Sequence, residues 1–198
     1  MNIRLNTLSE MVAVRLGDYP DYKSGGWTAS GGSSLSELVS IGLQPLATAS
    51  VAALPLKDCS HLKDFSQHLH TSTDWGLDCI YCCKLPVDFM RLHSLRMADW
   101  PAPLSEESPG DRLLAALGDR APKWMLRPLT PMLYVTPDSY GEGANLWFGP
   151  TSTSQPITAL YVPRPVYEPE EGMLYDFQPE ALLPLTDRIA DIIRDADS

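Results

Sequence analysis

Two pairs of residues in this chain have side chains of the kind that bind zinc. Cys59 and His61 are separated by one residue, and Cys79 and Cys82 by two, which is the spacing of half a zinc ribbon. The second pair lies in a strand-like run, where alternation puts Cys79 and Cys83 on one face and Cys82 on the other. We therefore favour buried free thiols, which pack as small hydrophobic side chains, over a metal site.

Other catalytic arrangements have less support. Four histidines are available to activate a thiol: His61, His68, His70 and His93. No Gly-flanked nucleophile accompanies any cysteine. The carboxylates of Glu168, Glu170 and Glu171 lie in a Pro-punctuated linker, whereas acid–base catalysis needs carboxylates held rigidly at a cleft. The sequence therefore predicts no enzyme activity, no cofactor and no metal.

Length and composition limit the class of protein. The chain has 198 residues, a net charge of −10, 18 Pro and 13 Gly. This length suits a single domain over residues 1–198, and the Pro and Gly content favours short elements with long loops, including a flexible Gly/Ser loop or arm over residues 18–33. The acidic balance excludes a polybasic nucleic-acid footprint. No apolar run has the length of a signal peptide or a bilayer-spanning helix, so we expect a cytoplasmic protein with reduced thiols and no membrane partner.

Capping patterns predict two helices near the start of the chain. Two residue pairs have the spacing of a capping box: Thr7 with Glu10, and Ser34 with Glu37. The first pair introduces a helix over residues 8–16 that Gly17 ends. The second introduces a helix that Pro45 kinks or ends, and residues 45–75 show no convincing helical pattern.

The remaining elements complete an α+β fold. A short helix is predicted over residues 111–117, and a C-terminal helix over residues 179–198 follows a Pro/acidic linker at residues 163–178. The predicted strands are residues 77–84, 90–97, 132–136, 145–148 and 157–162. The first two are candidates to pair with each other. We expect short N-terminal helices, a small and mainly antiparallel sheet, a C-terminal helix, and long Gly/Pro-rich loops or arms.

The order of these elements resembles that of the head-to-tail connector, or adaptor, proteins of tailed bacteriophages. The likeness is carried by Thr7–Asp18, by Leu85–Leu95, and by Ala159–Pro165 leading to Pro179–Leu183. In proteins of that kind a strand leads into a segment like the Leu-Pro-Val-Asp-Phe run that begins at Leu85. A later strand that ends in a Pro-rich turn leads to a closing helix. The family has a longer helical bundle before the sheet.

The resemblance implies a virion structural protein without enzyme activity. It implies a homo-oligomeric ring, commonly of twelve subunits, at the head–tail interface of the virion, with assembly in the host cytoplasm. The ring would bind the portal protein on one side and a tail protein on the other. A net negative charge suits such a conduit, because a repelling lumen lets DNA pass without sequence-specific binding.

Partner contacts are expected in two places. Trp27 lies in the Gly/Ser arm, and an aromatic side chain there is a candidate anchor on a partner surface. The C-terminal part supplies the other candidates: Glu168, Tyr175, Phe177, Leu182, Leu185, Ile189 and Ile192. One alternative is a tail-completion or tail-tube protein. An alternative of another class is a small zinc- or thiol-dependent enzyme that uses Cys59, His61, Cys79 and Cys82.

Overall fold

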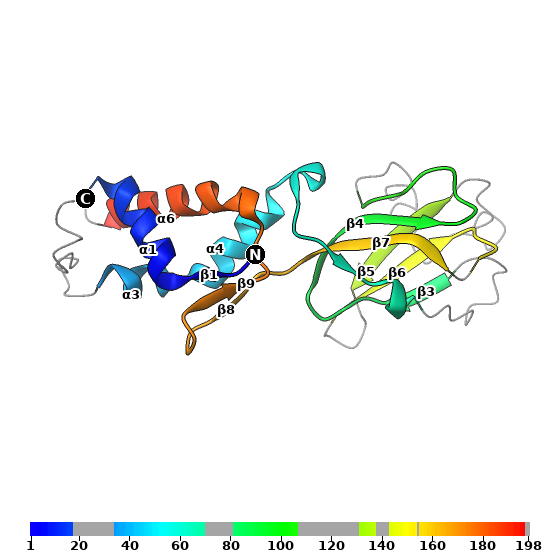
Figure 1. Ribbon diagram of the computed structural model, residues 1–198, viewed down its shortest axis with the longest axis horizontal. Coiled ribbons are helices and arrows are strands. Elements are labelled where there is room, and N and C mark those ends of the chain that lie inside the picture. Colours follow the sequence, from blue (N-terminus) through cyan, green and yellow to red (C-terminus); the bar gives the residue numbers. More distant parts are fainter. Residues whose placement is uncertain (18–33, 70–80, 107–130, 138–142, 154, 197–198) are drawn as a thin grey trace. The chain divides into compact units, whose positions relative to one another are not determined.

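The chain forms two compact units with separate cores (Figure 1). The computed structural model describes residues 1–17, 34–69, 81–106, 131–137, 143–153 and 155–196. The terminal unit consists of Met1–His61 and Arg164–Ser198, and the inserted unit consists of Leu62–Pro163. The predicted α+β class is confirmed, with helices and three small antiparallel sheets. Where the sequence predicts a single domain, the chain therefore has one unit built from both of its ends and one unit built from its middle.

Helices make up most of the terminal unit. The α-helices are α1 (Leu5–Leu16), α3 (Leu35–Ser40), α4 (Leu43–Ala52) and α6 (Leu182–Ala196), and the 3₁₀-helices are η1 (Leu56–Asp58) and η4 (Pro179–Ala181). The helix α6 packs against both α1 and α4. Its buried side chains, Leu185, Ile189 and Ile193, recur at helical spacing, which is the pattern that predicts this helix from sequence.

The two capping predictions have different outcomes. Ser34 and Glu37 form a complete capping box, in which the Glu37 N–H donates to Ser34 Oγ at 3.3 Å and the Ser34 N–H donates to Glu37 Oε2 at 2.8 Å. The box at Thr7 is wrong, because α1 already begins at Leu5. There the Leu5 N–H donates to the carbonyl of Gly172 at 2.8 Å, so a tertiary contact replaces the expected side-chain cap.

Pro45 begins a helix instead of ending one. The preceding helix α3 stops at Ser40, and Gly42, with φ of 76°, turns the chain into α4. Pro45 then stands in the first turn of α4, where a missing backbone N–H breaks no helical hydrogen bond. The expectation that residues 45–75 are not helical is therefore wrong for the residues of α4.

The predicted linker at residues 163–178 contains a hairpin. Strands β8 (Val166–Glu168) and β9 (Met173–Tyr175) pair antiparallel, and β1 (Ile3–Arg4) adds to β9, giving the order β1-β9-β8. Gln44 of α4 holds this hairpin, since its Nε2 donates to the carbonyl of Pro165 and its Oε1 accepts from the Tyr167 N–H, both at 2.7 Å. The Gln44 amide thus binds backbone groups beside the edge strand β8. The hairpin is therefore fixed by α4 on one side and by β1 on the other.

The inserted unit contains two three-stranded antiparallel sheets. Their orders are β2-β7-β4 and β3-β6-β5, and the strands are β2 (Lys63–Asp64), β3 (Tyr81–Lys84), β4 (Phe89–Met97), β5 (Met132–Pro137), β6 (Ala144–Gly149) and β7 (Pro156–Pro163). A 3₁₀-turn, η2 (Ser66–His68), follows β2. The predicted strands are confirmed where they are described. The suggested pairing of the first two is wrong, because β3 pairs with β6 and β4 pairs with β7.

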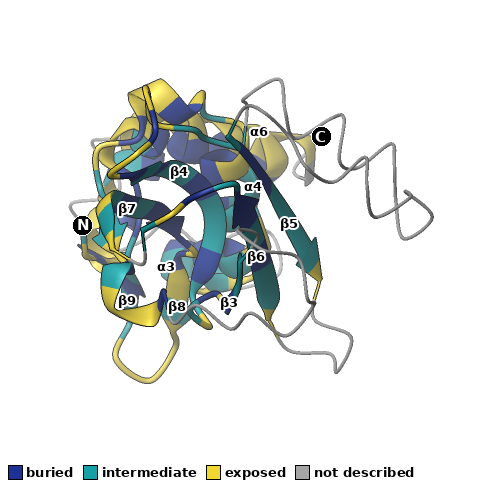
Figure 2. Cartoon of the chain, turned by 90° about the vertical axis from the view of Figure 1, so that its right-hand side faces the viewer, coloured by how far each residue is buried: buried dark blue, intermediate teal, exposed yellow. Residues whose placement is uncertain are grey.

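Both sheets of the inserted unit contribute to one core. Leu92, Leu95 and Met97 of β4 are fully buried, as are Leu146 of β6 and Ala159 of β7. Figure 2 colours the buried parts of the strands dark blue. Aromatic rings from both sheets fill the space between these aliphatic side chains. The buried positions of β4 are three residues apart over Phe89, Leu92 and Leu95, because register shifts against β7 add one residue to β4 in each interval and so keep these side chains on one face.

Two of the predicted segments lie outside the described residues. These are the flexible arm over residues 18–33 and the short helix over residues 111–117.

Gln178 joins two distant parts of the terminal unit. Its fully buried side chain accepts from the His61 N–H at 2.9 Å and donates to the His61 carbonyl at 2.6 Å. The backbone beside it is also tied down, since Phe177 exchanges hydrogen bonds with Met1 through its N–H and carbonyl groups. The segment that enters the inserted unit is therefore fixed to the C-terminal segment by one amide.

We expect Gln178→Leu to lower the free energy of unfolding by about 2 to 4 kcal/mol, because two hydrogen bonds are lost and two backbone groups of His61 are left without their partner. Urea unfolding followed by circular dichroism measures the change. Gln67→Leu, at an exposed glutamine, is the matched control and should shift stability by less than about 0.5 kcal/mol. Equal effects of the two substitutions would contradict the role given to Gln178.

Candidate interaction site at the turn before β4

A tight turn joins β3 to β4 and presents one apolar side chain to solvent. The Phe89 N–H donates to the carbonyl of Pro86 at 3.0 Å, closing a four-residue turn. Leu85 and Phe89 on either side are buried, whereas Val87 is 89% exposed. Because the buried side chains at both ends of the turn fix its position, the Val87 side chain at the tip stays exposed to solvent.

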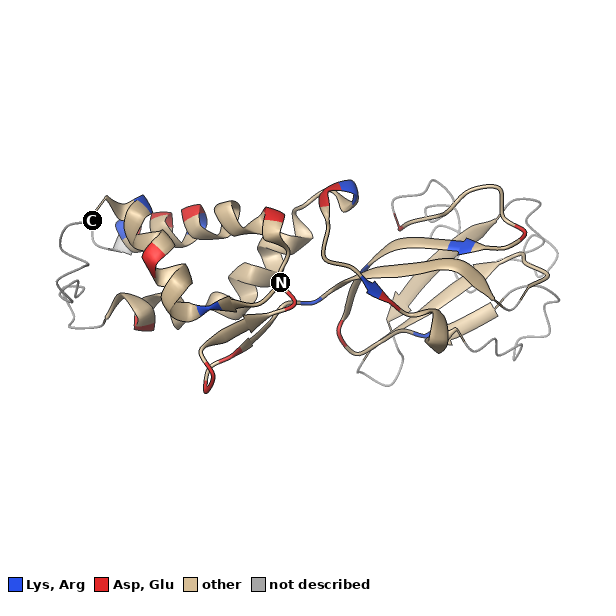
Figure 3. Ribbon diagram, in the orientation of Figure 1, with Lys and Arg blue, Asp and Glu red and all other residues tan. Residues whose placement is uncertain are grey.

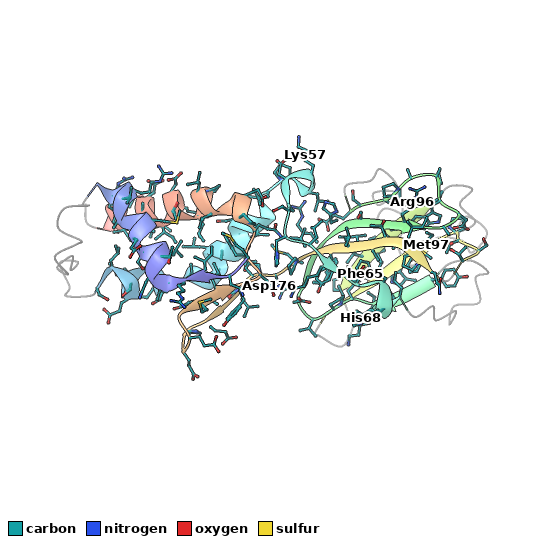
Figure 4. All side chains as sticks on the ribbon, in the orientation of Figure 1. Lys57, Phe65, His68, Arg96, Met97 and Asp176 are labelled. Atoms are coloured by element: carbon teal, nitrogen blue, oxygen red, sulfur yellow. The ribbon has the colours of Figure 1, made fainter. Side chains whose placement is uncertain are left out.

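Asp88 fixes this turn to two strands. Its Oδ2 accepts from Lys63 Nζ of β2 at 2.8 Å, and its Oδ1 accepts from the Tyr161 hydroxyl of β7 at 2.7 Å. The Tyr161 ring stacks on Phe89, with centroids 5.9 Å apart, and meets the edge of Phe65 at 6.0 Å. Figure 4 shows Phe65 within the inserted unit. Charge, hydrogen bonding and ring packing therefore all act on the same turn.

The ion pair sets the protonation state of Asp88. Burial by itself would raise the pKa of this carboxyl, but the hydrogen bonds from Lys63 and Tyr161, together with the Lys63 charge, outweigh burial and lower the pKa below the ordinary 3.8. Asp88 is therefore ionised at neutral pH. Its role is structural, because both carboxylate oxygens already have protein partners.

The cysteines do not form an activated thiol site in the described residues. Cys59 is buried in the terminal unit, and its Sγ lies 3.6 Å from the carbonyl of Pro55. Cys82 and Cys83 are in β3, where burial raises the pKa of Cys82 and raises that of Cys83 to about 12. Such thiols are protonated at neutral pH and are poor nucleophiles. Cys79 lies outside the described residues.

The histidines offer the described residues no metal site either. His61 Nε2 lies 3.1 Å from Asp176 Oδ1, and this pair sits in the terminal unit (Asp176 is labelled in Figure 4). No group of three or more His, Cys, Asp or Glu side chains in the described part of the chain could hold a metal ion. His68 is exposed on η2, and His70 lies outside the described residues.

The residues predicted to contact partners fall into three groups. Phe177, Leu185 and Ile189 are buried in the core of the terminal unit, and their contact with partners stays a prediction. Their apolar periodicity is a core signal. Four others have exposed or half-exposed side chains: Glu168, Tyr175, Leu182 and Ile192. Trp27 lies outside the described residues.

Sequence reasoning missed the residues that organise this site. Lys63, Asp88 and Tyr161 are far apart in the chain and match no motif, so only strand pairing brings them together. Tyr161 in an apolar strand is a weak signal, since a buried phenol needs a hydrogen-bond partner. Trp147 of β6 is half-buried, and its Nε1–H donates to Thr136 Oγ1 at 3.2 Å.

Comparison with known proteins gives no family assignment. The chain matches no protein-family model, no curated protein and no solved structure. Within the described residues, no helix has both the length and the apolar character that crossing a membrane requires.

Asp88→Asn should lower the free energy of unfolding by about 1 to 3 kcal/mol at pH 7, because the charged hydrogen bond with Lys63 is lost. The lowered pKa means that the carboxylate stabilises the fold above pH 3.8 and loses this effect as the pH falls through its folded pKa. The gap between wild type and variant should therefore shrink by pH 3. Urea unfolding at pH 7 and pH 3 measures it, with Asp58→Asn as the exposed control. A gap independent of pH would refute the ion-pair argument.

Alkylation of native protein at pH 8 should label Cys83 about 1,000-fold more slowly than in unfolded protein, since a pKa of about 12 in place of 9.0 reduces the thiolate fraction by that factor. Peptide mapping by mass spectrometry measures each cysteine separately. Cys82, which is half-buried, is the internal control and should react faster than Cys83. Rapid labelling of Cys83 in the folded protein would contradict the conclusion that burial keeps this thiol protonated.

Proposed function

We propose that the protein is a virion structural protein, a subunit of the head-to-tail connector ring that joins the portal to the tail and surrounds the DNA exit channel. The order of elements carries this proposal. Strand β3 leads directly into the turn of Leu85–Phe89, and β7 ends in the Pro163-Arg-Pro165 segment before the chain continues to the closing helix α6. This is the order that the resemblance to connector proteins implies.

The helical content of the terminal unit also supports the proposal. A longer helical bundle is the feature of connector proteins that the sequence pattern lacked. Helix α4 adds ten residues of helix to the N-terminal part, and α6 packs on both α1 and α4. The departure from the family pattern is therefore smaller in the folded chain than in the sequence.

Charge supports a conduit for DNA. Basic residues are outnumbered by acidic ones, 15 to 25, and the net charge is −10. A duplex passing through a ring of such subunits meets a repelling surface, so it slides without being held by phosphate contacts.

Light scattering of the purified full-length protein, with and without a phage portal, tests the proposal. We expect either a ring in solution or a monomer that becomes a ring on the portal. A protein that stays monomeric at high concentration and does not bind the portal would refute the proposed connector function.

Val87→Asp should weaken binding to the portal, or to the tail partner, by about tenfold or more, because a charge would replace an apolar contact at the tip of a fixed turn. Val87 is 89% exposed, so the fold should survive, and circular dichroism checks this. Gln67→Asp adds the same charge at another exposed position of the inserted unit and should leave binding unchanged. Unaltered binding of Val87→Asp to both partners would remove this turn from the interface.

A further inference from the structure

Among the described residues of the inserted unit, one half-buried cation has a buried nitrogen without a hydrogen-bond acceptor. Three basic side chains among the described residues are half-buried: Lys63, Arg91 and Arg96. Lys63 pairs with Asp88 at 2.8 Å, and Arg91 pairs with Glu106 at 3.0 Å. The Nε of Arg96 is buried and has no hydrogen-bond partner in the described part of the chain. Leaving a buried charged donor unmet is costly, so the missing acceptor needs an explanation.

Arg96 lies on the outer face of the sheet β2-β7-β4. Its neighbours Leu95 and Met97 are fully buried in the core, and alternation along β4 turns the side chain between them to the opposite face. Figure 4 labels Arg96 beside Met97 on this strand. The residue opposite Arg96 on β7 is Thr158, which carries no charge. Arg96 therefore belongs to a surface and is no part of the core.

Two carboxylates near Arg96 in sequence, like Asp88 in the turn before β4, already accept hydrogen bonds. Asp99 accepts from the Thr151 hydroxyl at 2.7 Å and from the Ser152 N–H at 2.7 Å. Glu106 accepts from Arg91 Nε and, at 2.9 Å, from the Leu92 N–H. Each has a structural task, so neither is available to neutralise Arg96.

An exposed apolar residue precedes the β7 residue that pairs with Arg96. Between the pairs Arg96–Thr158 and Met97–Pro156, strand β7 has one extra residue, Ile157, as in a β-bulge. The Ile157 side chain is 59% exposed. An arginine beside an apolar anchor is a typical composition for the centre of a protein–protein contact.

The complementary group is present elsewhere in the same chain. The β8–β9 hairpin carries three exposed carboxylates, from Glu168 at the end of β8 and from Glu170 and Glu171 in the turn. Figure 3 shows red acidic segments on this hairpin. Glu171 bonds the Tyr175 hydroxyl, whereas Glu168 and Glu170 have no hydrogen-bond or ion-pair partner in the described residues. The hairpin is anchored, since the carbonyl of Gly172 accepts from the Leu5 N–H at 2.8 Å. These carboxylates are therefore presented on an ordered element.

We propose that the Arg96–Ile157 surface of one copy binds the acidic β8–β9 turn of a second copy, with Glu168 or Glu170 as the acceptor for Arg96. The two surfaces lie on different units of the chain, so the contact is heterologous. A repeated heterologous contact generates a ring when its rotation closes. The inference rests on the proposed ring function and names the residues that hold neighbouring subunits together.

Charge reversal tests this contact in the full-length protein. Arg96→Glu should raise the concentration for half-assembly roughly 30-fold or more, since loss of one partner of a desolvated charge pair weakens association by that order. The double variant Glu168→Arg/Glu170→Arg should do the same. Combining all three substitutions should restore assembly to within about tenfold of wild type. Light scattering over a concentration series, or counting copies bound per portal, measures assembly.

Controls separate the possible outcomes. Arg188→Glu and Glu10→Arg make the same charge changes at exposed positions and should leave assembly unchanged. Arg96→Met, which keeps an unbranched apolar stem but removes the guanidinium group, covers the case in which Arg96→Glu does not fold, and it should also weaken assembly. If Arg96→Met assembles like wild type, or the triple variant shows no rescue, the contact is refuted while the ring function stands. If wild type never assembles, even with portal, both proposals fail.

Discussion

The carboxylate of Asp88 is the interaction on which the inserted unit depends most. It binds Lys63 of β2 and Tyr161 of β7 at the same time, and it stands in the turn that begins β4. The three strands of one sheet are thereby linked by a group at the end of that sheet, in addition to their backbone ladders. Since the Tyr161 ring also packs on Phe65 and Phe89, loss of the carboxylate would disturb core packing as well as charge.

The terminal unit is stabilised by a different kind of interaction, in which glutamine side-chain amides form hydrogen bonds with backbone N–H and carbonyl groups. Gln178 pairs with the N–H and carbonyl of His61, and Gln44 pairs with backbone groups on both sides of Val166. A neutral amide supplies one donor and one acceptor, so it can join two strand-like segments without the desolvation cost of a charge. This explains how segments with few apolar residues stay attached to a helical core.

Local patterns in the sequence predict the helices and strands well, but they do not predict which of these elements contact one another. The α6 periodicity and the Ser34 box are signals within one or two helical turns, and both are confirmed. The Thr7 box failed because Gly172, far along the chain, caps α1 through its carbonyl. Strand pairing failed for the same reason, since β4 and β7 are separated by two other strands. The sequence predicts Phe177 as a partner contact because residues 163–178 have the composition of a linker, whereas its side chain is fully buried.

Net charge makes short-range contacts decisive for any assembly of this chain. Copies that each carry −10 repel one another, although at physiological salt this repulsion decays over about 8 Å. Long-range steering therefore cannot bring subunits together in a defined register. The register between subunits must therefore come from groups that are stabilised only when they meet one particular partner group. The half-buried guanidinium of Arg96, whose Nε has no acceptor in the described residues, is such a group. Because acidic residues outnumber basic ones by 25 to 15, each cation on the surface is a distinctive contact point for a neighbouring copy.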